Sequence, residues 1–292
     1  MIIEKKRFVW FLLIICGLFF VSFVHRTLFF SHPSSVSCKE ILLNTVASVE
    51  KIKALKFNLK VAERIKGKLK QSQSHIKLSL SPKKIYLNLD GPEVLWVQGM
   101  NNGNALVNPA GFPYMNLNLD PLGSLMRENQ HHTIYEIGFD YFSDIIKNSI
   151  LLSGNDFEKY FKCGGTLVWN NRECYFITAE YPDFQYLDYT VQKGENLTII
   201  ARKLKVSEFM ILELNSAKVN NYHDVKANQK IQVPNVYGSK MILYIDKEFL
   251  LPRIIKVYDE KGLFESYEYH DLQVNPNILD EEFTKGYKEY GF

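Results

Sequence analysis

Apolar and polar residues alternate along much of the chain between residues 57 and 96, and this pattern predicts antiparallel strands. An apolar side chain at every second position places these side chains on one face of a strand. The turn-forming sequences Ser81-Pro82 and Asp90-Gly91-Pro92 separate the runs, and residues 101–104 form another turn. Strands with turns at nearly regular spacing predict a meander. The alternating positions are Phe57, Leu59, Val61, Ile76, Leu78, Leu80, Ile85, Leu87, Leu89, Val94 and Trp96.

Two stretches show the spacing of three and four residues that is typical of helices. One helix is predicted over residues 38–55 and a second near residues 141–151, before further strands at 166–169 and 175–181. The apolar face of the first helix consists of Leu42, Val46, Val49 and Ile52.

The strand pattern stops near residue 188 and returns after residue 235. The later strands have no sheet of their own to join, so we predict that residues 38–188 and 235–292 form one sheet domain. The segment 189–234 is then an insert within that domain. The later strands are predicted at residues 241–246, 253–258 and 263–269.

The insert has a pattern of its own. Tyr189-Thr190-Val191 predicts a strand, and a helical face of Leu197, Ile200, Ala201 and Leu204 follows. Ser207 is suited to cap a second helix, which Asn215 ends as a residue that tolerates the left-handed conformation. Residues 231–233 alternate as a second strand, and Pro234 stops it. The predicted order is strand, helix, helix, strand.

From Tyr189 to Pro234 the insert resembles a LysM domain, a family that binds polymers of N-acetylglucosamine such as peptidoglycan. The family's Gly-Asp-Thr-Leu loop is here Gly194-Glu195-Asn196-Leu197, and Asn228 stands where a glycine is usual. The resemblance implies a shallow sugar groove between the first strand–helix loop and the loop after the second helix. The alternative is a module that serves only as a spacer. The implied carbohydrate-binding residues are Gly194, Glu195, Asn196, Leu197, Thr198, Asn215, Ser216 and Ala217.

Most of the chain from residue 55 onward, outside the insert, resembles the class of the lipoprotein carriers LolA and LolB, and within that class it is more similar to an uncharacterised bacterial envelope family. The resemblance implies an α+β fold in which a curved antiparallel sheet, a LolA-like half-barrel, wraps around a helix. In that class the concave face can hold acyl chains, so a lipid or a lipoprotein is a second possible partner. The resemblance is carried by residues 84–86, 95–99, 244–248, 250–253, 269–272, Asn275 and 280–283.

The N-terminus predicts export. Residues 4–7 are Glu-Lys-Lys-Arg, and residues 8–24 carry no charge. This order is typical of a signal peptide or a transmembrane anchor, here predicted over residues 1–37. Because neither Cys16 nor Cys38 follows a glycine or an alanine, we favour an anchor or a late-cleaved signal over a lipoprotein. The predicted location is the cell envelope or periplasm of a Gram-negative bacterium.

Candidate chemistry is sparse. Cys163 and Cys174 flank a predicted hairpin and can form a disulfide in an oxidising compartment, or they are buried free thiols. Were His131 and His132 on a strand, they would point to opposite faces, so no metal site is predicted from them and Glu136. No motif of a hydrolase, a phosphate loop or a dinucleotide site is present, and we expect no cofactor and no enzyme activity.

Charge adds little to this picture. The net charge is +3, and residues 50–84 contain eleven Lys or Arg, which form either a solvated outer face or a surface for anionic lipid headgroups. No nucleic-acid motif accompanies them. The sequence therefore favours a non-catalytic envelope protein that binds peptidoglycan. A lipid or lipoprotein carrier with LysM as its lid or docking element is the alternative, and a wall hydrolase is disfavoured.

Overall fold

The structure is a computed structural model that describes residues 36–292, which form one compact unit. The predicted signal or anchor, including the basic residues 4–7 and the uncharged residues 8–24, lies outside the described residues. Within residues 36–292, none of the helices combines the length and the apolar character that a membrane crossing requires.

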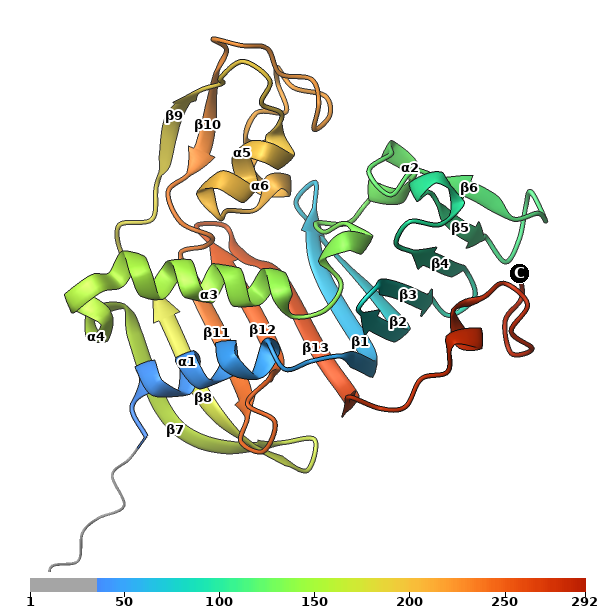
Figure 1. The fold of residues 1–292 in the computed structure, drawn as a ribbon. Coiled ribbons are helices and arrows are strands. Elements are labelled where there is room, and N and C mark those ends of the chain that lie inside the picture. Colours follow the sequence, from blue (N-terminus) through green and yellow to red (C-terminus); the bar gives the residue numbers. More distant parts are fainter. Residues whose placement is uncertain (1–35) are drawn as a thin grey trace, which may run out of the picture. The chain divides into compact units, whose positions relative to one another are not determined.

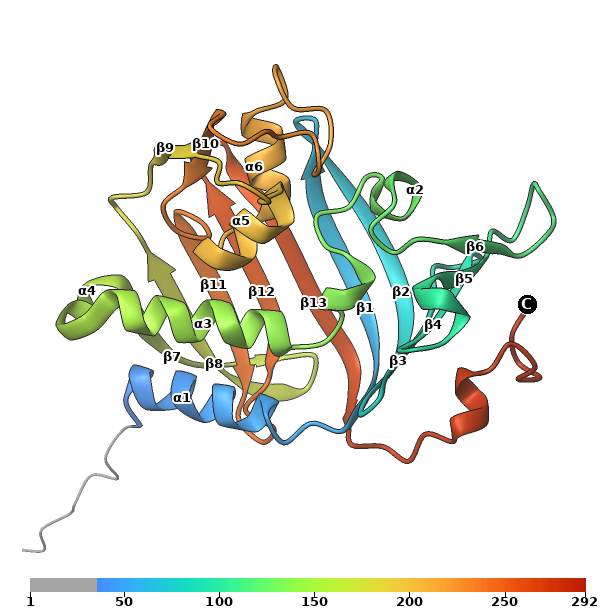
Figure 2. The same ribbon diagram turned by 45° about the horizontal axis from the view of Figure 1, so that its top comes forward.

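Most of the described chain forms an antiparallel sheet of eleven strands in the order β6-β5-β4-β3-β2-β1-β13-β12-β11-β8-β7 (Figures 1 and 2). The sheet curves around the helices on one of its faces, which confirms the predicted fold class. Its strands are β1 Ala54–Ile65, β2 Lys68–Leu80, β3 Lys83–Asn88, β4 Glu93–Val97, β5 Ala105–Asn108, β6 Leu117–Leu119, β7 Phe161–Trp169, β8 Arg172–Glu180, β11 Lys240–Asp246, β12 Pro252–Asp259 and β13 Gly262–Val274.

The alternating pattern found in the sequence forms the inner face of this sheet. Phe57 on β1 and Ile76 and Leu78 on β2 are buried in the main core. β1 and β2 are longer than the predicted runs because Lys66-Gly67, both at positive φ (50° and 74°), turn the chain directly from one strand into the other.

Two helices, α1 (Cys38–Val49) and α3 (Asp140–Ser153), cross the same face of the sheet (Figure 1). Short helices precede and follow α3, namely α2 (Ser124–Arg127) and α4 (Phe157–Tyr160). The prediction of a helix as far as residue 55 is wrong, because α1 ends at Val49. The side-chain oxygen of Asn275 accepts hydrogen bonds from the backbone N–H groups of Lys53 (2.6 Å) and Ala54 (3.2 Å), which ties this part of the chain to the end of β13.

The insert leaves the large sheet between β8 and β11, which are neighbouring strands. Its own strands, β9 (Tyr186–Thr190) and β10 (Lys230–Pro234), pair antiparallel in a separate sheet. Between them lie α5 (Leu197–Leu204) and α6 (Glu208–Leu214), in the predicted βααβ order. Backbone groups of Gln185 and Asn235 bond to each other where the two connecting segments run side by side (3.0 Å).

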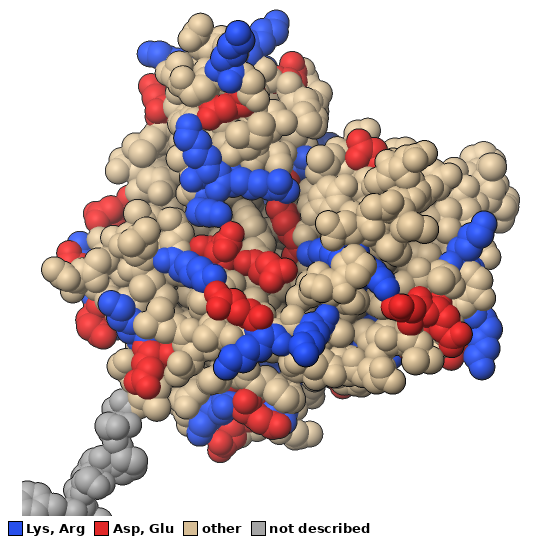
Figure 3. Space-filling model, in the orientation of Figure 1, with Lys and Arg blue, Asp and Glu red and all other residues tan. Residues whose placement is uncertain are grey.

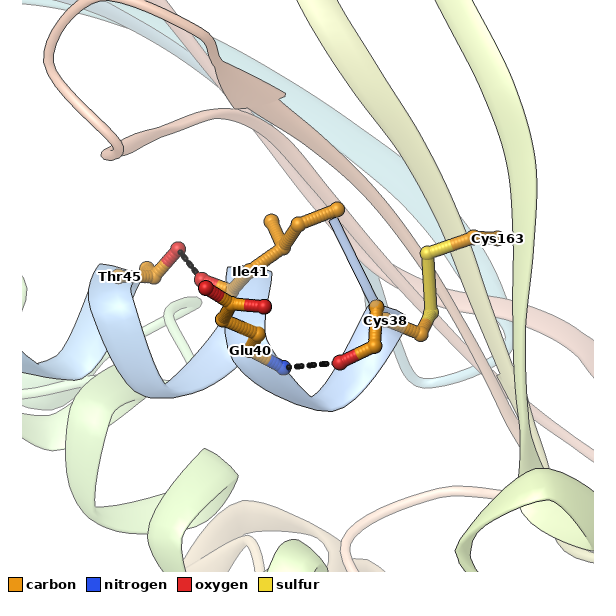
Figure 4. Close-up of a disulfide and its surroundings, with 6 residues drawn as sticks. Cys38, Glu40, Ile41, Thr45 and Cys163 are labelled. Carbon is orange, nitrogen blue, oxygen red and sulfur yellow. Dashed lines mark hydrogen bonds between the residues drawn. A yellow bond between two sulfur atoms is a disulfide. The ribbon is translucent and has the colours of Figure 1, made fainter. Parts of the chain in front are cut away.

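The predicted pairing of Cys163 with Cys174 is wrong. Cys163 forms a disulfide with Cys38 at the start of α1, with a Cα–Cα distance of 5.5 Å (Figure 4). The register between β7 and β8 explains the difference, since Cys163 lies opposite Ile177 and Cys174 lies opposite Leu167. Cys174 is a buried free thiol. The disulfide therefore ties the first helix to an edge strand of the sheet.

Candidate functional site

The insert has a small core of its own, separate from the core under the large sheet. Its helices begin at residues whose side chains cap them: Asn196 Oδ1 accepts from the N–H of Ile199 (2.8 Å), and Ser207 Oγ accepts from the N–H of Met210 (3.3 Å). Asn228 adopts positive φ (67°), as expected for a residue that replaces a glycine. The buried members of this core are Val191, Leu197, Ile200, Ala201, Val206, Ile211, Val219, Tyr222, Ile231 and Val233.

The loop before α5 and the loop after α6 lie side by side. The N–H of Leu197 donates to the carbonyl oxygen of Tyr222 (2.9 Å), and the side chains of Asn196 and His223 are in hydrogen-bond contact (3.1 Å). These contacts bring together the two loops in which the sugar-binding residues were predicted. Of the eight, Gly194, Ser216 and Ala217 are exposed, Glu195, Asn196 and Asn215 are half-buried, and Leu197 and Thr198 are buried.

Several of the predicted sugar-binding side chains already have protein partners. Glu195 accepts from the hydroxyl of Tyr189 (2.8 Å) and the N–H of Gln192 (2.9 Å). Asn215 does not adopt the predicted left-handed conformation (φ −105°); its side chain instead exchanges hydrogen bonds with the backbone of Gln232 (2.8 and 2.9 Å). Asn215 therefore joins the end of α6 to β10, and the exposed members of the eight are Gly194, Ser216 and Ala217.

The insert is attached to the sheet domain through the segment 124–141, which contains α2 and the turn before α3. Arg127 forms a buried ion pair with Glu208 at the start of α6, and its guanidinium lies 3.1 Å from the ring centre of Tyr222. Phe209 stacks on His131, with ring centres 4.2 Å apart. These contacts place the insert directly against a wall of the main core.

The same segment closes one side of a cavity of about 480 Å³ on the inner face of the sheet. Such a volume falls within the range of about 300–1,000 Å³ that is typical of small-molecule pockets. Its apolar walls come from several strands and from α3; they include Phe57, Leu59, Val61, Ile76, Leu87, Val94, Phe142, Ile145, Met241, Ile255 and Val257.

Exposed apolar side chains surround α2 and the β5–β6 loop. Leu125 of α2 is 69% exposed and also lines the cavity, and Phe112 and Tyr114 in the loop are each 85% exposed. Figure 3 shows few charged side chains in this region on the face that it presents.

The cavity changes from apolar to acidic along two neighbouring strands. β1 and β13 pair so that Leu59 lies opposite Tyr269, Val61 opposite Tyr267, and Glu63 opposite Glu265. All six side chains line the cavity. Alternation along β1 continues the inward-facing positions 57, 59 and 61 to Glu63, which is a local sign of the acidic end that the sequence prediction does not include.

At the acidic end, three carboxylates and two histidines form one buried group, here called the acidic network. It consists of Glu63, His131, His132, Glu136 and Glu265, together with Tyr237 and Tyr267, whose hydroxyls donate to Glu265 (2.9 Å) and Glu63 (2.6 Å). His131 Nδ1 lies 2.8 Å from Glu265, and His132 lies 3.1 Å from Glu136 and 3.4 Å from Glu265.

The two histidines do not point to opposite faces, as predicted for a strand. They lie in the turn before a 3₁₀ helix (Ile134–Glu136), and both imidazoles contact Glu265. Glu63, His131 and Glu265 each offer a ligand atom within 4.8 Å of the others. His131, however, has Glu265 at Nδ1 and the carbonyl of Arg64 at Nε2 (3.1 Å), so both ring nitrogens face acceptors. Both ring nitrogens of His131 therefore already have protein partners.

Charge pairing governs ionisation in the acidic network. Burial opposes the charged form of Glu265, but His132 and His131 outweigh it and hold the pKa of this carboxyl well below its usual value. Burial likewise opposes the protonation of His132, but Glu265 and Glu136 raise the pKa of this imidazole well above its usual value. At neutral pH Glu265 is therefore ionised and His132 is protonated.

Comparison with known families identifies the insert. Residues 189–234 match the LysM domain, with the boundaries expected from the sequence, and so the insert is a LysM domain. Residues 52–185 match DUF1571, a family described as a protein of unknown function. Among curated proteins, none matches this chain.

Several solved structures are similar to the chain at low identity. Lipoprotein LppX of Mycobacterium tuberculosis is 13% identical over 84% of this chain and 100% of that chain, with a TM-score of 0.40. A putative outer membrane lipoprotein-sorting protein domain of Vibrio parahaemolyticus is 12% identical over 84% of this chain and 95% of that chain, with a TM-score of 0.28. A chain of the MucA/MucB complex of Pseudomonas aeruginosa is 14% identical over 84% of this chain and 60% of that chain, with a TM-score of 0.39.

Proposed function

We propose that this protein is a non-catalytic cell-envelope protein that binds the N-acetylglucosamine polymer of peptidoglycan through residues 189–234. The observation that carries the proposal is the LysM domain itself, with its two loops held side by side by the hydrogen bond from Leu197 to Tyr222. The exposed residues Gly194, Ser216 and Ala217 would contact the sugar. Glu195, Asn196 and Asn215 would shape the groove from its sides, and Leu197 and Thr198 from below.

The proposal includes the organisation and location of the chain. Residues 38–188 and 235–292 form one scaffold domain, and LysM is inserted at one of its hairpins. Residues 1–37 direct export to the envelope or periplasm. The disulfide between Cys38 and Cys163 supports an oxidising compartment, because such bonds persist mainly outside the cytosol.

A shallow site with few buried groups gives modest affinity, on the order of micromolar to millimolar, because little is gained to offset the entropy of association. Titration of the protein with soluble N-acetylglucosamine oligomers, followed by amide NMR, tests the proposal. We expect chemical-shift changes in the amide signals of Gly194, Ser216 and Ala217. Maltose oligomers of equal length should cause no such changes. Shifts confined to the sheet domain, or no shifts at millimolar oligomer, would contradict it.

The cavity favours a second candidate function, the transport or storage of a lipid or lipoprotein acyl chain. Its volume suits a small amphiphile, and burial of such a molecule against its apolar walls is favourable in proportion to the apolar area buried. LysM would then serve as the docking element. Native mass spectrometry of the purified protein tests this candidate. A bound amphiphile of discrete mass is expected, and protein of ligand-free mass after mixing with amphiphiles would exclude it.

A further inference from the structure

The polar end of the cavity is rich in carboxylates, and the tyrosine and histidine donors beside them already have partners. The hydroxyls of Tyr237 and Tyr267 donate to Glu265 and Glu63. His132 directs one ring nitrogen to Glu136 and the other to Glu265. The hydroxyl of Tyr141, which also lines the cavity, donates to the carbonyl of Val206 (3.2 Å). These donors are therefore directed at protein acceptors rather than at an entering ligand.

Acceptors, by contrast, remain available there. Glu136 uses Oε2 for both of its contacts, with His132 (3.1 Å) and with the N–H of Thr133 (3.0 Å). Among residues 36–292, its other oxygen, Oε1, has no hydrogen-bond donor. Thr133 lines the cavity and is 3% exposed; its hydroxyl, which can accept or donate, is without a partner in the same part of the chain.

The charges lead to the same conclusion. Three carboxylates face two imidazoles in the acidic network, and the two ring nitrogens of His132 lie 3.1 Å and 3.4 Å from carboxylates. An anionic group placed beside Glu136 and Glu265 would meet like charge in a poorly solvated site, where repulsion is stronger than in water. A hydroxyl or an ammonium group would instead donate to the free carboxylate oxygen.

The remainder of the cavity is suited to a hydrocarbon chain. Going along β1 from Glu63, the next inward-facing residues are Val61, Leu59 and Phe57. A ligand lying along this strand would thus have its polar end at Glu63 and its apolar end at Phe57.

We propose that the cavity binds an amphiphile with a hydrocarbon tail and a head that donates hydrogen bonds or carries positive charge, such as a hydroxyl or ammonium group, and that it discriminates against anionic heads. The proposal rests on the second candidate function above and defines the ligand class of that site.

Amphiphiles that share one tail test the head preference. The full-length protein is loaded with a fluorescent apolar dye, and the dye is displaced below the micellar range by dodecylammonium, monododecanoylglycerol or dodecyl sulfate. We expect the first two to bind at least about tenfold more tightly than dodecyl sulfate, because the carboxylates outnumber the imidazoles and repel an anionic head. Glu136→Gln should reduce this ratio of affinities between the first two amphiphiles and dodecyl sulfate. Glu281→Gln removes an exposed carboxylate outside the cavity and should preserve the ratio.

The possible failures are distinguishable. Dodecyl sulfate binding as tightly as the other two would overturn the head preference and leave the carrier candidate standing. No displacement by any of the three would overturn both. Neither result affects glycan binding, which the oligomer titration measures separately.

Discussion

Glu63 and Glu265 lie directly opposite each other on β1 and β13, and both are almost fully buried, at 6% and 1% exposure. Like charges at such positions destabilise a sheet. Here His131 bridges them, since its backbone N–H donates to Glu63 (3.1 Å) and its ring to Glu265 (2.8 Å). The segment 124–141 therefore does three things at once: it neutralises the acidic pair, closes the cavity and holds the LysM domain through Arg127.

The acidic network should set the pH range of stability. Because the pKa of Glu265 is lowered on folding, this carboxylate contributes to the free energy of unfolding at a pH above its pKa in the unfolded chain, about 4.3. The contribution is lost as the pH falls below that value. Because the pKa of His132 is raised, its contribution is complete below about 6.5 and is lost as the pH rises through its folded value. Denaturant unfolding at a series of pH values should show greatest stability between these limits. In the acid range, the unfolding free energy of Glu265→Gln should change less with pH than that of the parent. An equally steep change in the variant would contradict this account.

The ion pair between Arg127 and Glu208 should behave as a unit. Removing one partner leaves the other charged and buried, which costs about 3–5 kcal/mol, whereas replacing both with apolar residues of similar size is often nearly neutral. We expect Arg127→Met and Glu208→Leu each to destabilise strongly and the double variant to recover most of the loss. The unfolding free energies of the parent, the two single variants and the double variant test this expectation. Additive losses would show that the pair is not coupled.

The disulfide should contribute substantially to stability, because it closes a loop across a sequence separation of 125. Loss of such a bond typically costs about 2–5 kcal/mol. Cys163→Ser should therefore unfold at a clearly lower urea concentration than the parent, and a reducing agent should lower the parent's midpoint but not that of the variant. Cys174→Ala provides the control, since Cys174 is buried and unpaired. Equal midpoints for parent and Cys163→Ser would contradict the assigned pairing.

Asn215 should stabilise the LysM domain even when no sugar is bound. Asn215→Ala removes two hydrogen bonds to the half-buried backbone of Gln232, at a cost of about 1–3 kcal/mol. Hydrogen exchange should show faster opening of β10 without any sugar present. Exchange unchanged in β10 would show that Asn215 does not carry this structural role.

Local patterns predicted much of this molecule. The alternation around Phe57, Ile76 and Leu78 predicted the sheet, and the loop sequence at Gly194 predicted the LysM domain, because both depend on residues close together in the sequence. The capping role of Ser207 was predicted for the same reason.

Long-range relationships could not be predicted in the same way. The pairing of Cys38 with Cys163 depends on how α1 lies across the sheet and on the register of β7 with β8. The acidic network brings together Glu63, His131 and Glu265 from three distant segments. Its one local sign is the appearance of acidic residues at inward-facing positions of β1 and β13.

The central claim is that the two LysM loops bind peptidoglycan, and co-sedimentation of the full-length protein with insoluble peptidoglycan tests it most directly. Ala217 is exposed in the second loop, so Ala217→Trp should block the groove without disturbing the core. Lys230→Trp, at an exposed position of β10 outside both loops, is the matched control. We predict that the parent and Lys230→Trp sediment with the polymer and that Ala217→Trp remains in solution. A parent that stays in solution, or an Ala217→Trp variant that sediments as the parent does, would contradict the claim.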